Sequence, residues 1–105
     1  MTQNSQCNLE LLESQATTGK FRINGTLNFD SIITLNQHAQ NLFLNYKDIT
    51  VDLSGVTYVN SAGLALLLEW KRLALLNKKA IHLQGIPGKL LNIARMSEIE
   101  KILSV

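Results

Sequence analysis

Residues 51–68 read VDLSGVTYVNSAGLALLL, and this stretch decides the fold. Its β-branched beginning belongs to a short predicted strand over residues 48–53. We expect a loop over 54–60 and then a helix that runs to about residue 77, with Asn60 or Ser61 as its N-terminal cap. A strand that leads through a loop into an apolar helix is typical of an α/β domain.

Further along the chain, a second strand is followed by a second turn and helix. Residues 80–84 (AIHLQ) predict another strand, 85–88 (GIPG) predict a turn, and 89–96 predict a short third helix. A last helical turn is expected over 98–103. Strands separated by helices pair in parallel through right-handed crossovers.

The N-terminal half predicts a hairpin followed by a helix. Residues 8–13 and 20–27 predict two strands around a turn over 14–19, and the second strand alternates polar with apolar residues. Asn28 or Asp30 is expected to cap a helix that ends near residue 45. The fold class is therefore α/β, with a mixed β-sheet in which an N-terminal antiparallel hairpin precedes parallel strands.

The composition is that of one folded domain. The 105 residues are 46% hydrophobic and 17% charged, so the chain is too short for two good cores and too apolar for disorder. We expect a flexible N-terminus over 1–7 and a domain over 8–105.

The net charge of +2 is too small to predict nucleic-acid binding. The longest apolar run, 64–68, is too short to insert in a membrane, and residues 1–8 show no signal peptide.

Candidate catalytic and metal-binding residues are few. His38 and His82 lie far apart in the sequence, and Cys7 is the single cysteine. A metal site needs three or four ligands, so we expect no metal and no cofactor. The chain has neither a GxxxxGK[ST] nor a GxGxxG phosphate-binding loop. These absences favour a binding or switching module over an enzyme, and a lone cysteine suits a reducing cytosol.

The start of the helix after residue 60 carries a hydroxyl. Backbone N–H groups at a helix N-terminus favour negative charge, so Ser61 is placed to be phosphorylated, to meet a partner, or merely to cap the helix. Gly63 lies in the first turn, where it costs helix stability. Close approach of another backbone is one rationale for that glycine, and tolerance at a helix end is the other.

The same helix is apolar around most of its circumference. Trp70, Leu66 and Leu73 extend the apolar arc beyond the stripe that one sheet face covers. Either a neighbouring helix or a partner protein must cover the excess. Trp70 is therefore a candidate partner-binding residue.

Two segments together resemble the STAS domain family, to which anti-sigma factor antagonists belong. They are DLSGV at 52–56 and NSAGLALL at 60–67, and the resemblance extends over nearly the whole chain from Leu9. It implies a mixed sheet with helices mainly on one face, and a role in binding other proteins. In the antagonists a kinase phosphorylates the serine directly before the motif glycine. That position is Ala62 here, and Asn60 replaces the usual aspartate, so only Ser61 can accept a phosphate.

The segment SAGLALLLEW and the strand at 82–85 are most similar to the MlaB type of STAS domain. This resemblance implies a non-enzymatic cytoplasmic subunit, peripheral to the inner membrane, that binds the ATPase (MlaF-like) of an Mla ABC transporter together with permease and periplasmic lipid-binding subunits. Such transporters move phospholipid and maintain outer-membrane lipid asymmetry in Gram-negative bacteria. The resemblance also implies a docking loop formed by Asn60, Ser61, Ala62 and Gly63. The alternatives are an anti-sigma factor antagonist switched by a serine kinase, and a small enzyme or ligand-binding STAS domain.

Overall fold

The computed structural model describes residues 7–96, which form four strands and three helices. In chain order these are β1 (Cys7–Gln15), β2 (Thr18–Leu27), α1 (Ile32–Phe43), β3 (Asp48–Val59), α2 (Ser61–Leu76), β4 (Ala80–Gln84) and α3 (Gly88–Met96). The predicted order of elements is confirmed. Residues 1–6 of the expected flexible N-terminus, and the helical turn expected over 98–103, lie outside the described residues.

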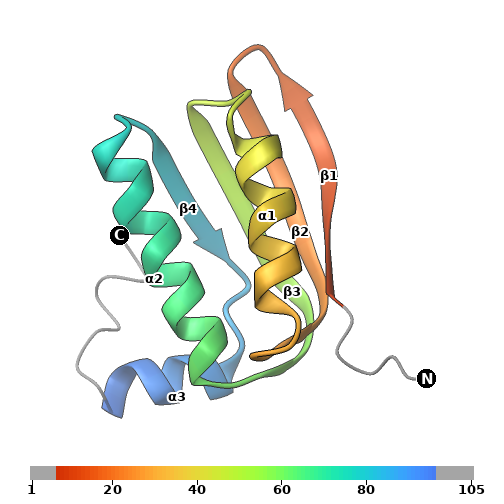
Figure 1. The fold of residues 1–105 in the computed structure, drawn as a ribbon, viewed down its shortest axis with the longest axis vertical. Helices are drawn as coiled ribbons and strands as arrows, with labels where there is room; N and C mark the ends of the chain where they lie inside the picture. Colours follow the sequence, from red (N-terminus) through yellow and green to blue (C-terminus); the bar gives the residue numbers. More distant parts are fainter. Residues whose placement is uncertain (1–6, 97–105) are drawn as a thin grey trace.

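The strands form one mixed sheet in the order β1-β2-β3-β4. β1 and β2 pair antiparallel as the predicted hairpin, whereas β2 with β3 and β3 with β4 pair in parallel. Helices α1 and α2 lie side by side over one face of this sheet, and α3 lies beyond its lower end in Figure 1. The α/β fold with a mixed sheet and helices mainly on one face is therefore confirmed.

Strand β3 is twice as long as the sequence predicted. The expected loop over 54–60 is wrong, because β3 continues to Val59 and pairs with the second half of β2. The register shifts near Gly55, where a Cβ would lie 2.8 Å from the carbonyl oxygen of Ile23. A glycine inside a strand marks such an irregularity, and it makes the segment look like a loop in the sequence.

The segment before α1 also differs from expectation. Neither Asn28 nor Asp30 is the N-cap, because the helix begins after Ser31. The Asn28 side chain instead accepts hydrogen bonds from the backbone N–H groups of Asp30 (2.9 Å) and Ser31 (3.1 Å). The buried Ser31 hydroxyl donates to the Thr26 carbonyl oxygen at 2.5 Å. These bonds fix a tight turn whose tip is Phe29.

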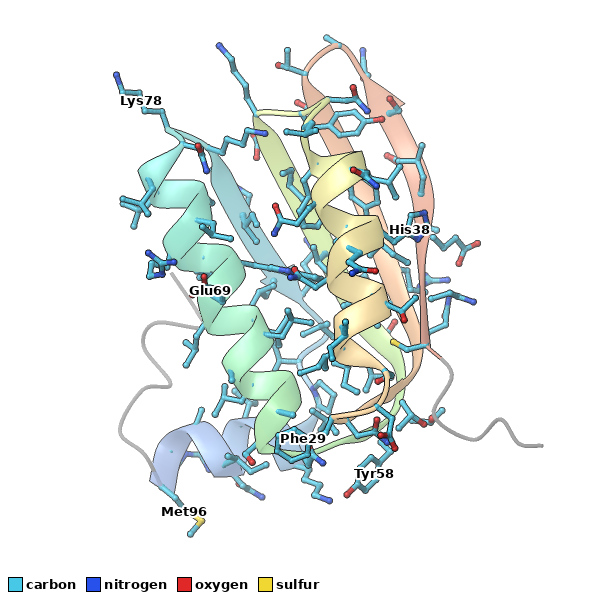
Figure 2. The ribbon with its side chains drawn as sticks, in the orientation of Figure 1. Phe29, His38, Tyr58, Glu69, Lys78 and Met96 are labelled. Carbon is cyan, nitrogen blue, oxygen red and sulfur yellow. The ribbon has the colours of Figure 1, made fainter. Side chains whose placement is uncertain are left out.

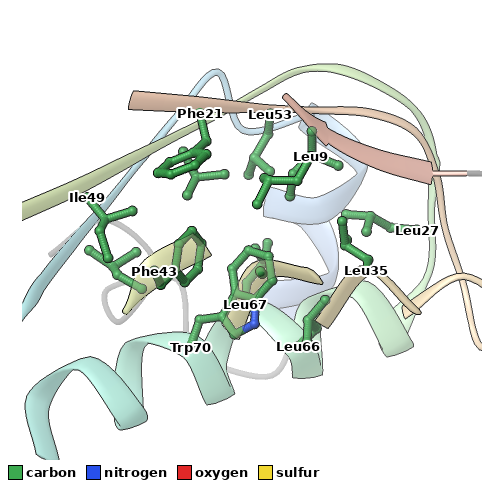
Figure 3. Packing of buried hydrophobic residues seen from close by; sticks show 14 of the residues in the cluster. Leu9, Phe21, Leu27, Leu35, Phe43, Ile49, Leu53, Leu66, Leu67 and Trp70 are labelled. Carbon is green, nitrogen blue, oxygen red and sulfur yellow. The ribbon is translucent and has the colours of Figure 1, made fainter. Parts of the chain in front are cut away.

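A chain of aromatic rings runs through the core between the helices and the sheet. Tyr46 packs edge-on against Phe21, Phe21 against Phe43, and Phe43 against Trp70, with ring centroids 5.2–5.6 Å apart. Edge-to-face pairs at these distances stabilise the fold beyond the apolar area they bury. Figure 3 shows Phe43 and Trp70 enclosed by aliphatic side chains from the helices and strands. The aromatic rings thus link both helices to the sheet.

Candidate functional site

The first turn of α2 is capped by Asn60. The Asn60 backbone is extended, and its side-chain oxygen accepts the Ala62 N–H at 2.9 Å. The Asn60 carbonyl oxygen accepts the N–H groups of Gly63 (3.0 Å) and Leu64 (3.3 Å). Of the two residues that the sequence offered as caps, the structure selects Asn60 over Ser61.

Ser61 is the first residue inside the helix, and its side chain is exposed. Within residues 7–96 its hydroxyl has no hydrogen-bond partner. Because Asn60 already supplies the cap, the Ser61 hydroxyl is not needed to cap the helix. It lies beside the positive end of a 16-residue helix dipole, where an acceptor group is stabilised.

Ala62 and Gly63 face the interior instead. Ala62 is 3% exposed. A Cβ at Gly63 would lie 2.7 Å from Cγ2 of Val59 and 3.0 Å from Cβ of Leu27. The sequence left close approach of another backbone as one rationale for Gly63, but in the structure the atoms nearest to an added Cβ belong to side chains of the domain itself. Neither residue presents a side chain to a partner.

Trp70 is a core residue in this structure, and its side chain offers almost no exposed surface for the partner contact that the sequence suggested. The side chain is 1% exposed in the isolated chain. Its indole N–H donates to the side-chain oxygen of Asn36 in α1 at 2.7 Å. The neighbouring helix α1 therefore covers this part of the apolar arc, through Asn36 and the Phe43 ring.

Three exposed side chains that the sequence did not single out lie at the same end as Ser61. Phe29 is 69% exposed at the tip of the turn before α1, and Tyr58 is 45% exposed near the end of β3. The Lys89 ammonium of α3 stands 4.6 Å from the centre of the Tyr58 ring, a cation–π contact. In Figure 2, Phe29 and Tyr58 lie at the lower end of the domain, where α2 begins. We call Phe29, Tyr58, Asn60, Ser61 and Lys89 the α2-start surface.

Alternation along β3 could have identified Tyr58. Val59 is buried, so its neighbour must point to the opposite side of the strand. The predicted loop over 54–60 hid that alternation. Phe29 gives no signal in the sequence, because its exposure depends on the turn that Asn28 and Ser31 hold.

Titratable groups on the open face of the sheet pair with one another. Arg22 contacts Asp52 at 3.2 Å, and His82 contacts Asp48 at 3.0 Å. The Ser54 backbone N–H, with help from Arg22, holds the pKa of Asp52 below its usual value.

In the part of the chain that the structure describes, no three His, Cys, Asp or Glu side chains are grouped to hold a metal ion. Nor does any described helix have the length and apolarity that a membrane crossing needs.

Comparison with models of known protein families identifies the family to which the chain belongs. The model of the family described as "Mlab, STAS domain" matches residues 11–104. The chain therefore belongs to the STAS domain family, in its MlaB type. A search of curated protein sequences finds no match.

Solved structures with the same fold include two anti-sigma factor antagonists. One is SpoIIAA in its unphosphorylated form, with a TM-score of 0.69 and 15% identity over 89% of this chain and 83% of that one. The other comes from Mycobacterium paratuberculosis, with a TM-score of 0.74 and 12% identity over 97% of this chain and 86% of that one. At these identities the likeness establishes the fold alone.

Proposed function

We propose that this chain is a non-enzymatic subunit that binds the ATPase of an Mla-type ABC transporter. It does so in the cytoplasm, at the inner membrane, in a complex with permease and periplasmic lipid-binding subunits. Through this contact it supports phospholipid trafficking and outer-membrane lipid asymmetry. Membership of the MlaB type of STAS domain supports the choice of partner.

The observation that carries the proposal is the exposed Ser61 hydroxyl. Asn60 caps the helix without it, and the described residues offer it no partner. A hydroxyl that is exposed and has no partner among residues 7–96 is available to donate to, or accept from, a group on another protein. Two large exposed aromatic side chains, Phe29 and Tyr58, lie at the same end of the domain. Aromatic residues around a polar group are typical of a protein–protein interface.

A phosphorylation-switched antagonist is less well supported. The position that carries phosphate in the antagonists is Ala62, which has no hydroxyl and is buried. Ser61 is the exposed hydroxyl nearby, so the two functions differ in whether Ser61 is modified in cells. Intact mass spectrometry of protein from its native cell decides this. We expect no stoichiometric phosphate, and a dominant species heavier by one phosphoryl group would revive the switch.

Co-purification with the ATPase subunit tests the proposal directly. The tagged chain, co-expressed with the ATPase, should elute with it as one complex in size-exclusion chromatography. Phe29→Ala should weaken binding by tenfold or more, about 1.4 kcal/mol or greater, if Phe29 anchors the contact. Leu44→Ala is the matched control, because Leu44 is 75% exposed at the opposite end of the helical layer. An unchanged affinity for Phe29→Ala, or an equal loss for both variants, would count against the α2-start surface.

A further inference from the structure

Part of the wide apolar arc of α2 faces water. Trp70 and the other buried side chains of this helix face the sheet and α1. On the other side of the helix, Leu75 is 78% exposed and Leu76 is 66% exposed. Two exposed leucines near the end of one helix, in line with further apolar residues, mark a candidate contact surface. We define the outer stripe of α2 as Ala65, Leu68, Glu69, Arg72, Leu75 and Leu76.

The outer stripe has the spacing of a helix–helix contact. Residues 65, 68, 72 and 75 follow one another at intervals of three, four and three positions. This alternation keeps side chains on one seam between two packed helices. The buried residues of α2 lie on the opposite side of the helix, so the seam points away from the sheet. The sequence of α2 therefore provides one face for its own domain and a second face for another helix.

The charged pair within the stripe indicates which helix fits there. Arg72 donates two hydrogen bonds to Glu69, of 2.9 and 2.7 Å, on the exposed surface of the helix. A two-fold rotation about an axis that crosses the helix near residue 70 places Arg72 of each copy opposite Glu69 of the other. The stripe therefore complements its own charges when two α2 helices run antiparallel. Two parallel helices would instead place like charges together.

The sizes of the side chains fit the same arrangement. About this axis, Leu75 of one copy lies opposite Ala65 of the other, so a large side chain meets a small one at both ends of the contact. The helix dipoles also attract, because the start of each helix lies beside the end of the other. The 16 residues of α2 span about 24 Å. A contact of that length buries less than the roughly 1,200 Å² of a stable complex, so the association is weak and reversible.

We propose that this chain forms a weak two-fold dimer in which the outer stripes of two α2 helices pack antiparallel. The inference does not depend on the proposed function, because its tests use the chain alone. Sedimentation equilibrium of the full chain from about 5 to about 500 µM should show a monomer–dimer equilibrium, with a dissociation constant on the order of 100 µM.

One matched pair of variants tests the apolar part of the stripe. Leu75→Gln should raise the dissociation constant at least about tenfold, because it removes the side chain that packs on Ala65. Leu44→Gln makes the same chemical change just after α1, where Leu44 is 75% exposed, and should leave the dissociation constant unchanged.

Exchange of the charges tests the pairing between copies. Arg72→Glu and Glu69→Arg each place like charges opposite one another, so either variant alone should remain monomeric. An equimolar mixture of these two variants should associate. The double variant Glu69→Arg/Arg72→Glu should regain self-association, and circular dichroism verifies that each protein is folded.

Disulfide formation tests the antiparallel direction in a Cys7→Ser background. A mixture of Ala65→Cys and Leu75→Cys chains should form a mixed disulfide faster than either chain forms one with itself. The reason is that Ala65 of one copy lies about 15 Å along the axis from Ala65 of the other.

A chain that stays monomeric at the highest concentration would overturn the proposal and assign the stripe to a different protein. So would an unchanged dissociation constant in Leu75→Gln, a mixture of the two charge variants that does not associate, or faster disulfide formation between identical positions.

Discussion

Replacement of Gly63 by alanine tests whether the domain itself, rather than a partner, requires glycine at this position. In an open helix position the change would stabilise by up to about 1 kcal/mol through helix propensity. The structure predicts the opposite sign. The added Cβ would lie 2.7 Å from Cγ2 of Val59 and 3.0 Å from Cβ of Leu27. Both neighbours are at most 2% exposed, so neither can move into solvent.

The size of the effect follows from overpacking. An extra methyl group in a packed core costs about 1–3 kcal/mol, from which the gain in propensity must be subtracted. With about 1 kcal/mol subtracted, we expect Gly63→Ala to lower the free energy of unfolding by up to about 2 kcal/mol. Val59→Ala removes the closer of the two contacting atoms. In that background the cost of Gly63→Ala should shrink by about 1 kcal/mol, a coupling typical of residues in contact.

Urea unfolding of the four proteins in this double-mutant cycle measures the coupling. An isolated-domain stability that is unchanged or raised in Gly63→Ala would refute the packing argument. If that same variant lost binding to the ATPase, the close approach would be to the partner's backbone after all. Additive effects of the two substitutions would show that Val59 is not the obstacle.

Three further predictions concern Trp70, the cap of α2 and Cys7. Trp70→Ala should lower the free energy of unfolding by about 3–5 kcal/mol, as expected for a core aromatic residue. A smaller loss in urea unfolding, together with abolished ATPase binding, would show that Trp70 contacts the partner. Asn60→Ala should cost about 0.5–2 kcal/mol and Ser61→Ala less than about 0.5 kcal/mol; the reverse order in thermal unfolding would make Ser61 the cap. Burial raises the pKa of the Cys7 thiol to about 11, so at pH 8 the folded protein should react with iodoacetamide on the order of a hundredfold more slowly than the urea-unfolded chain. Equal rates would show that the half-buried Cys7 thiol is not shielded from water in solution.

The periodicity of the sequence was sufficient to predict the order of elements but not their lengths. The alternation at 20–27 and the β-branched residues of 48–53 identified both central strands. The extension of β3 to Val59 comes from pairing with β2 across an irregular register, and a long-range contact of that kind leaves no local pattern. Gly55, which permits the irregularity, is the residue that made the segment resemble a loop.

The sequence also predicted only part of the candidate site. The motif at 60–63 located the start of α2, and Ser61 is exposed there. The sequence could not tell which residue of the motif faces the core, because Asn60 and Ser61 are both good helix caps. Burial of Trp70 depends on Asn36 and Phe43, which come from a different helix. A single helix with a wide apolar arc cannot reveal whether its own domain or a partner covers it.

The affinity of Ser61→Asp for the transporter ATPase tests the central claim most directly. Aspartate at the first helical position suits the helix dipole, and Asn60 keeps the cap, so the variant should be at least as stable as the native chain. Gln37→Glu is the control, since it adds the same charge on the exposed surface of α1. We predict that Ser61→Asp folds normally and binds the ATPase at least about tenfold more weakly, whereas Gln37→Glu binds like the native chain. A stable Ser61→Asp protein with native affinity would contradict the claim that this hydroxyl forms part of the contact.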